Sequence, residues 1–264
     1  DITALKPGRS CRAALLTSSA KMIAEVVVLA EAQRHWLLMP RACLAAALAT
    51  LNRYLIMDDV TLADRTEART LLAIQGPRTL EILRNAPMLP AMDYSVTGEA
   101  GALLMVPTQE TATVRTKLLA LGAVAVNWEA VNVHRVEAGV PWWGVDMDET
   151  TLLSETGLER QLASFTKGCY VGQEIVARMD TYGSASRKLM QLLCEGEAVP
   201  VTGDAIVKDG EEIGRITSAV FSPSLNKPVA LGYVKRPHYE AGNSAAVRRD
   251  GRAIAATLAT LARI

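Results

Sequence analysis

The sequence is poor in aromatic residues and histidine, and it has no excess of either charge. Aromatic residues make up 5% of the 264 residues, and Lys+Arg equals Asp+Glu at 28 each. Proteins that bind nucleic acid or anionic membrane surfaces usually carry a basic excess. The balance of charge therefore argues against both functions, and we expect neither a nucleic-acid partner nor direct membrane contact.

Long hydrophobic runs are also absent. The longest apolar stretches, residues 26–30 and 42–51, are shorter than the roughly 20 residues that a membrane-spanning helix needs. No secretory signal peptide is visible, and the chain opens at Asp1 with sequence typical of the interior of a domain. We expect a cytoplasmic protein whose natural N-terminal segment is missing, together with any organelle leader it carried.

Cysteine and histidine are too scattered to form a recognisable metal site. The cysteines contain no C-x-x-C pair, and the three histidines are equally dispersed. Such spacing fits neither a disulfide scaffold nor a zinc site, and it is typical of a reducing compartment. The spacing therefore predicts no resident metal site built from Cys11, Cys43, Cys169, Cys194, His35, His134 and His238.

Hydrophobic periodicity predicts two units of strands and helices in the first half of the chain. The first unit is expected to contain strands over residues 11–16, 22–29, 35–39 and 60–63, with a helix over residues 41–51 that begins after Pro40. In the second unit, strands over residues 71–75 and 102–106 alternate with helices over residues 76–83 and 110–121. This alternation favours α+β sandwiches of the ferredoxin-like kind.

The second half of the chain changes in character. We expect a helix over residues 129–137, followed at residues 140–166 by a long loop of the kind that is usually functional or disordered. After Arg187 come short β-rich runs separated by glycine and proline, at residues 190–195, 205–208, 212–218, 229–235 and 245–248. These runs predict a small antiparallel β-barrel at the C-terminus.

The segment Lys167-Gly168-Cys169-Tyr170-Val171-Gly172-Gln173-Glu174 carries the strongest chemical signal. Gly168 precedes an apolar-periodic run, which predicts a tight turn into a helix with Cys169 near its first position. A helix N-terminus and a neighbouring lysine both favour the thiolate form of a cysteine. A free cysteine is usually a small buried core residue, so the residues alone leave both interpretations of Cys169 open.

This octapeptide resembles the K-G-C-Y-x-G-Q-E signature of the YgfZ family, which is related to the glycine-cleavage T-protein. Residues 5–22 resemble the family's segment after its first strand, and Arg135-Val136-Glu137-Ala138-Gly139-Val140-Pro141 resembles its R-x-E-x-G-x-P. Residues 214–218, Ser222-Pro223 and residues 230–234 resemble its C-terminal I-G-x-x-T-S…S-P…A-L-G-Y-V. The resemblance covers most of the chain.

The resemblance implies a three-domain cloverleaf around a central folate channel. Residues 1–65 with 129–187 would form a discontinuous first domain, residues 66–128 a second ferredoxin-like domain, and residues 188–264 the β-barrel. Tetrahydrofolate, or a one-carbon derivative of it, is the cofactor that the resemblance implies. We expect a monomer.

The resemblance also assigns site residues. Glu137 would hold the pterin edge, because a carboxylate can accept paired N–H bonds from an aminopyrimidine. A solvated carboxylate at a helix end, with Arg135 paired to it on the surface, is the alternative. Cys169 and Lys167 would be the chemically active residues, and the remaining cofactor-binding residues would be Arg178, Arg135, Tyr170 and Gln173.

Two stretches depart from the family pattern. Ser18-Ser19-Ala20 precede Lys21 where the family usually has glycine, so this turn is expected to differ. The T-protein's catalytic Asp lies in an N-A-x-N-x-x-x-D run, whereas residues 39–46 here contain no carboxylate. Asp58 and Asp59 are weak substitutes, because adjacent side chains diverge in direction. The sequence therefore predicts no glycine-cleavage aminomethyltransferase activity.

The function that the resemblance implies is a tetrahydrofolate-binding accessory factor for the assembly, maintenance or repair of iron–sulfur proteins, including those that support tRNA modification. Its partners would be transient client or assembly proteins, because a cluster usually takes several thiolates and only Cys169 is a candidate ligand. Two alternatives stay open. One is a folate-dependent one-carbon (aminomethyl) transferase, and the other is a thiol redox protein in which Cys169 is oxidised.

Overall fold

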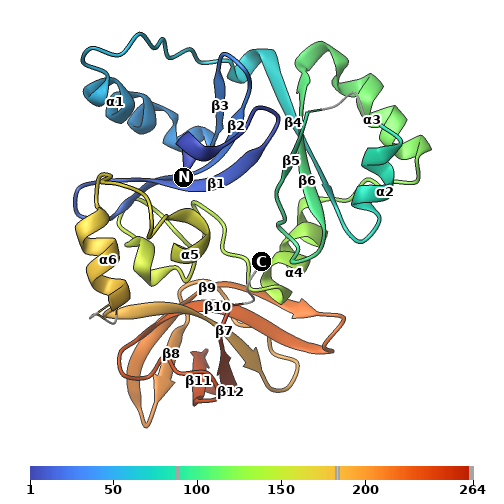
Figure 1. Cartoon of the computed structure of the whole chain (residues 1–264). Coiled ribbons are helices and arrows are strands. Elements are labelled where there is room, and N and C mark those ends of the chain that lie inside the picture. Colours follow the sequence, from blue (N-terminus) through green and yellow to red (C-terminus); the bar gives the residue numbers. More distant parts are fainter. Residues whose placement is uncertain (87–89, 182, 184, 262–264) are drawn as a thin grey trace. The chain divides into compact units, whose positions relative to one another are not determined.

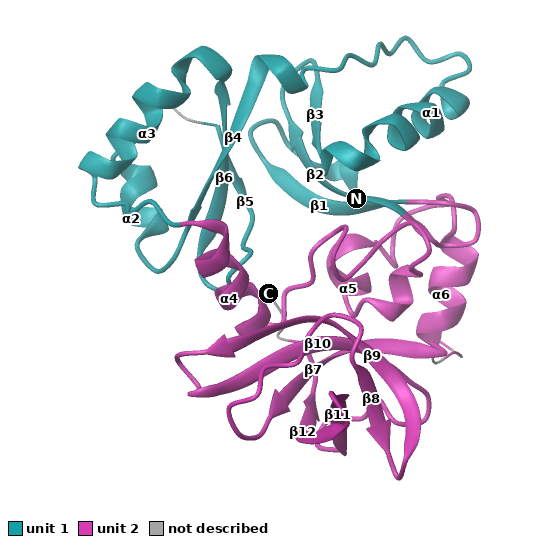
Figure 2. Cartoon of the chain, turned by 180° about the vertical axis from the view of Figure 1, so that it is seen from behind, with its two compact units in different colours: residues 1–15, 23–126 teal, residues 16–22, 127–264 magenta. Residues whose placement is uncertain are grey.

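The chain forms two compact units in the computed structural model, which describes residues 1–86, 90–181, 183 and 185–261. One unit comprises Asp1–Leu15 and Ile23–Val126, and the other comprises Leu16–Met22 and Asn127–Ile264. Figure 2 colours the two units separately. Within the described residues, every helix is too short or too polar to cross a bilayer.

The first sheet has three strands, with the second strand at its centre. It contains β1 (Ser10–Leu16), β2 (Met22–Ala30) and β3 (His35–Leu38), and it is preceded by the short helix η1 (Ile2–Ala4). β2 is rich in valine, which packs well on a pleated surface, and it is buried along almost its whole length. Its one charged residue, Glu25, accepts an ion-pair contact of 2.8 Å from Arg12 on β1.

A helix follows this sheet as predicted, but the expected strand after it does not form. η2 (Arg41–Cys43) leads into α1 (Leu44–Tyr54). Residues 60–63 are irregular, so the strand predicted there is wrong. The physical reason is that Val60 is 56% exposed and its neighbours are mostly exposed as well, which leaves the segment without an apolar face to bury.

The second sheet has the order β4-β6-β5 and is covered by two helices. Its strands are β4 (Arg69–Gln75), β5 (Ala91–Asp93) and β6 (Gly101–Pro107). The helices are α2 (Thr79–Arg84) and α3 (Thr111–Ala120), with η3 (Thr66–Ala68) and η4 (Thr108–Glu110) as short turns. One core joins the sheet to both helices, formed by Ile74, Ile82, Ala102, Leu104, Val106, Val114 and Leu118.

The C-terminal part is a closed six-stranded antiparallel barrel of order β10-β7-β12-β11-β8-β9 (Figure 1). Its strands are β7 (Arg187–Cys194), β8 (Ala205–Lys208), β9 (Glu211–Ser222), β10 (Lys227–Lys235), β11 (Ser244–Arg249) and β12 (Arg252–Ala259). The predicted α+β class with a C-terminal β-barrel is confirmed. The division into three domains stays a prediction.

Between the second sheet and the barrel, the chain forms several short helices. α4 (Trp128–Glu137) begins where the Asn127 side chain accepts a hydrogen bond from the amide of Ala130. Val136 on this helix packs against barrel residues such as Leu231. The predicted long loop contains η5 (Leu153–Glu155) and α5 (Glu159–Leu162), and α6 (Gln173–Thr181) comes after it.

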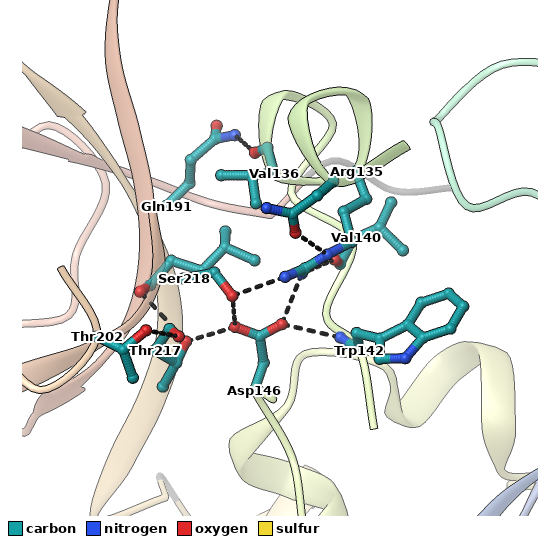
Figure 3. A network of polar contacts seen from close by, with 11 residues as sticks. Arg135, Val136, Val140, Trp142, Asp146, Gln191, Thr202, Thr217 and Ser218 are labelled. Carbon is teal, nitrogen blue, oxygen red and sulfur yellow. Dashed lines mark hydrogen bonds and ion pairs between the residues drawn. The ribbon is translucent and has the colours of Figure 1, made fainter. Parts of the chain in front are cut away.

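A buried ion pair joins α4, the loop after it and the barrel (Figure 3). The side chain of Arg135 is 1% exposed, and its Nη1 lies 2.7 Å from Oδ2 of Asp146. Oδ1 of Asp146 accepts hydrogen bonds from Ser218 at 2.7 Å and Thr217 at 2.5 Å, both on β9. The remaining guanidinium bonds go to Asn132, Val140 and Ser218. The alternative in which Arg135 pairs with Glu137 on the surface is therefore wrong.

Replacement of Asp146 tests how much this pair stabilises the fold. Asp146→Asn keeps the shape but leaves the buried Arg135 cation uncompensated, which we expect to lower the free energy of unfolding by about 3–5 kcal/mol. Urea denaturation measures this change. The control is Glu67→Gln, which breaks a pair with Arg41 whose side chains are 76% and 84% exposed and which contributes little. Equal effects of the two substitutions would contradict the prediction.

Candidate functional site

Glu137 lies at the end of α4, against the turn between β9 and β10. Its Oε1 accepts hydrogen bonds from Ser222 Oγ at 2.5 Å and Ser224 Oγ at 2.7 Å. Burial alone would raise the pKa of Glu137, but the hydrogen bonds from the two serines outweigh burial and lower the pKa below its usual value. The side chain is 14% exposed, so the alternative of a solvated carboxylate is wrong.

The Glu137 carboxylate keeps the capacity to bind further donors. A carboxylate offers about four acceptor positions, and the two serine hydroxyls use only part of them. Oε2 lies 3.9 Å from Nδ1 of His134, which is beyond hydrogen-bond distance. The arrangement holds an ionised carboxylate in a fixed orientation, with Oε2 outside the hydrogen bonds from the two serine hydroxyls.

Cys169 is exposed and lies ahead of a helix rather than inside its first turn. α6 begins at Gln173, so the predicted placement of Cys169 near the first helical position is wrong. The reason is Gly172, whose φ of +83° lies in the left-handed region and prevents the helix from starting earlier. A Cβ at Gly172 would also lie 2.8 Å from the carbonyl oxygen of Thr17, so only glycine fits.

Among the residues that the structure describes, Cys169 is the only exposed cysteine. Cys43 and Cys194 are buried, and Cys11 is half-buried. Burial raises the pKa of Cys194 to about 11, which keeps that thiol protonated. Reagents and partner proteins in solution therefore reach Cys169 more readily than the other three thiols.

The residues predicted to act with Cys169 largely contact one another. Nζ of Lys167 lies 4.9 Å from the ring centroid of Tyr170. The amide of Tyr170 donates to Oε1 of Gln173, and the amide of Gln173 donates back to the Tyr170 carbonyl. Arg178 is exposed on α6 and forms no ion pair within the described residues. These contacts shape the loop that presents the thiol.

The predicted site residues therefore form separate groups. Arg135 pairs with Asp146 in the buried network, and Glu137 accepts hydrogen bonds from Ser222 and Ser224. The residues around Cys169 contact one another. Among the described residues, no hydrogen bond or ion pair joins Glu137 to the Cys169 loop. The sequence alone did not indicate that Ser224 contacts Glu137 or that Asp146 pairs with Arg135. The S-P pattern at Ser222 was a signal only for the turn that contains Ser224.

Comparison with known proteins supports the fold and the barrel. Residues 187–262 match the family of glycine cleavage T-protein C-terminal barrel domains. The match begins at the first residue of β7 and covers all six barrel strands. The YgfZ assignment within the wider family stays a prediction.

Whole-chain relatives have aminomethyltransferase names. The chain is 25% identical to an aminomethyltransferase of Nostoc sp., covering 98% of this chain and 75% of that protein. It is 26% identical to one of Cutibacterium acnes, covering 98% and 78%. The crystal structure of glycine cleavage system aminomethyltransferase T from Bartonella henselae superposes with a TM-score of 0.84 at 24% identity, covering 98% and 76%. Along nearly all of its length, the chain is similar to the glycine-cleavage T-protein family, with the same fold and a matching C-terminal barrel.

Proposed function

We propose that this protein binds tetrahydrofolate or a one-carbon derivative of it. The observation that carries the proposal is the ionised carboxylate of Glu137, which two serines orient and which retains acceptor capacity. An aminopyrimidine presents adjacent N–H donors, which is the geometry that a carboxylate binds best. The similarity to aminomethyltransferases over 98% of the chain supports the same ligand class.

Glu137→Gln should weaken tetrahydrofolate binding while the shape of the site is kept. The loss of charge-assisted hydrogen bonds is worth about 1.5–3 kcal/mol, or a loss of affinity of about ten-fold or more. Isothermal titration calorimetry measures the change. Glu129→Gln, at the exposed start of the same helix, is the matched control and should bind as the wild type does. If Glu137→Gln also binds as the wild type does, Glu137 is not in the folate site.

One-carbon transfer is the first candidate use of the bound folate, and the names of the relatives support it. The stretch that carries the T-protein's catalytic Asp corresponds here to residues 39–46, which form the start of η2 and α1 and contain no carboxylate. Asp58 and Asp59 lie in an exposed irregular segment after α1. A transferase of this kind would need an acid–base group from elsewhere in the chain and would act on a different aminomethyl or one-carbon donor.

The missing carboxylate predicts no turnover in the glycine-cleavage reaction. Purified protein, supplied with the other components of that system and tetrahydrofolate, should release no ammonia above background. A T-protein that carries its catalytic Asp serves as the positive control. Turnover would refute the prediction, and loss of that turnover in Asp58→Asn or Asp59→Asn would identify the substitute acid.

An accessory role for iron–sulfur proteins is the second candidate, and the exposure of Cys169 favours it. An exposed thiol on a short loop can reach a partner's cluster or cysteine, whereas a buried one cannot. Because a cluster usually takes several thiolates, Cys169 would share the ligation with a partner for a short time. Bound folate would then lie in the same protein as the reactive thiol without being consumed.

Cys169 should react first when an alkylating reagent is limiting. Iodoacetamide should label Cys169 before Cys11, Cys43 and Cys194, because the other three thiols are buried or half-buried. Peptide mass spectrometry measures the order.

The accessory role further predicts that Cys169→Ser folds normally but fails to support iron–sulfur enzymes in cells. The control Cys11→Ser should support them. Normal support by Cys169→Ser would exclude the accessory role through this residue and leave the transferase candidate.

A further inference from the structure

A cavity of about 480 Å³ lies between the loop after α4 and the barrel. Its walls come from residues 144–148, 150 and 151 and from strands β7, β9 and β10, all within one compact unit. Neither Glu137 nor Cys169 lines it, so the proposed folate contacts leave it unassigned. The volume lies within the usual range of small-molecule sites.

The hydroxyl of Tyr233 marks this cavity as a polar site. Tyr233 lies on β10, lines the cavity and is 9% exposed. Its hydroxyl is buried and lies near the Thr151 side chain, but it makes no hydrogen bond of standard geometry to any part of the chain that the structure describes. Burial raises the pKa of Tyr233, so the hydroxyl stays protonated and can donate. A buried unpaired hydroxyl is unfavourable compared with phenylalanine, unless a ligand uses it.

The positive charges of the cavity wall are only partly compensated. Arg187 lies directly opposite Lys235 in the β7–β10 register, and like charges in such positions destabilise a sheet. Glu155 lies 3.1 Å from Arg187 and neutralises it. Arg215 pairs with Glu212 at 2.9 Å.

Lys235 has no such carboxylate partner. Its Nζ donates to the backbone oxygen of Glu212 at 3.3 Å, and no carboxylate among the described residues lies within ion-pair distance. Because Arg187 and Arg215 pair with carboxylates of the chain, Lys235 is the cation of the cavity wall without a carboxylate partner among the described residues.

Asp148 is the anion of the wall that forms no ion pair within the described residues. Its Oδ1 accepts hydrogen bonds from the amide and hydroxyl of Thr150 and from the hydroxyl of Thr151. The hydrogen bond from the Thr150 hydroxyl is the main cause that lowers the pKa of Asp148, and the charge of Arg187 also helps to lower it, so the carboxylate stays ionised. No cation within the described residues forms an ion pair with it, and Asp146, the other aspartate that lines the cavity beside it, is paired with Arg135.

We propose that this cavity binds a free amino acid. Lys235 and the Tyr233 hydroxyl take the carboxylate, and Asp148 takes the ammonium group. A zwitterion matches both remaining charges and the unpaired donor at once, whereas a simple carboxylate or a simple amine leaves one charge unmatched. The site is independent of the folate proposal, because it shares no residue with it.

Calorimetric titration of the standard amino acids into the whole chain at neutral pH tests this site. Acetate and methylammonium serve as probes that carry only one of the two charges. At least one amino acid should bind at millimolar concentration or below, and more tightly than either single-charge probe. Lys235→Gln and Asp148→Asn should each weaken that binding about ten-fold or more, because each removes a charged partner.

Tyr233→Phe separates a binding role from a structural one. It removes a hydroxyl without a partner, so the unfolding temperature should stay the same or rise while amino-acid binding weakens by several-fold. Tyr239→Phe is the matched control: it removes a hydroxyl that donates to the Ala185 carbonyl at 2.8 Å outside the cavity. That control should lower the unfolding temperature and leave binding unchanged.

Three results would overturn the proposal. They are the absence of binding by every amino acid at millimolar concentration, equal binding of acetate, and unchanged binding in the Lys235, Asp148 and Tyr233 variants.

Discussion

The buried Arg135–Asp146 pair is the interaction on which the rest of this region depends. It takes two charges out of water, which is favourable only when every donor and acceptor around them is satisfied. Residues from α4, from the following loop and from β9 bind all three guanidinium nitrogens of Arg135 and both carboxylate oxygens of Asp146. The pair therefore fixes α4 and the loop against the barrel (Figure 3).

Both proposed sites follow from that constraint. Glu137 comes two residues after Arg135, so anchoring Arg135 also determines where the helix end meets Ser222 and Ser224. The loop that supplies Asp146 continues directly into Asp148, which lines the amino-acid cavity. The buried network thus orients the Glu137 carboxylate at the end of α4 and shapes the cavity wall formed by the following loop. The charges of Arg135 and Asp146 pair with each other.

Strand periodicity made most of the barrel predictable, and composition explains what was missed. The strand predicted over residues 205–208 matches β8 at both ends, because the β-branched Ile206 and Val207 lie in a short run with aspartate and glycine on both sides. β12 was not predicted, since its alternation depends largely on alanine, which has low β-propensity. The strand expected at residues 60–63 failed because pairing partners and burial, which the local sequence does not contain, decide strand formation.

Candidate site residues could be singled out where a local motif carried them and not where a distant contact defined them. The family resemblance singled out Glu137, and the octapeptide singled out Cys169, but Ser222, which holds Glu137, is 85 residues away in sequence. The helix start at Gln173 depended on the left-handed Gly172, a backbone property that the apolar pattern does not reveal.

The most direct test of the central claim is a crystal structure of this protein grown with tetrahydrofolate. The account predicts that the aminopyrimidine edge donates hydrogen bonds to the Glu137 carboxylate while Ser222 and Ser224 stay bound to it. A structure in which folate binds elsewhere, or in which saturating tetrahydrofolate leaves Glu137 bonded only to its serines, would contradict it.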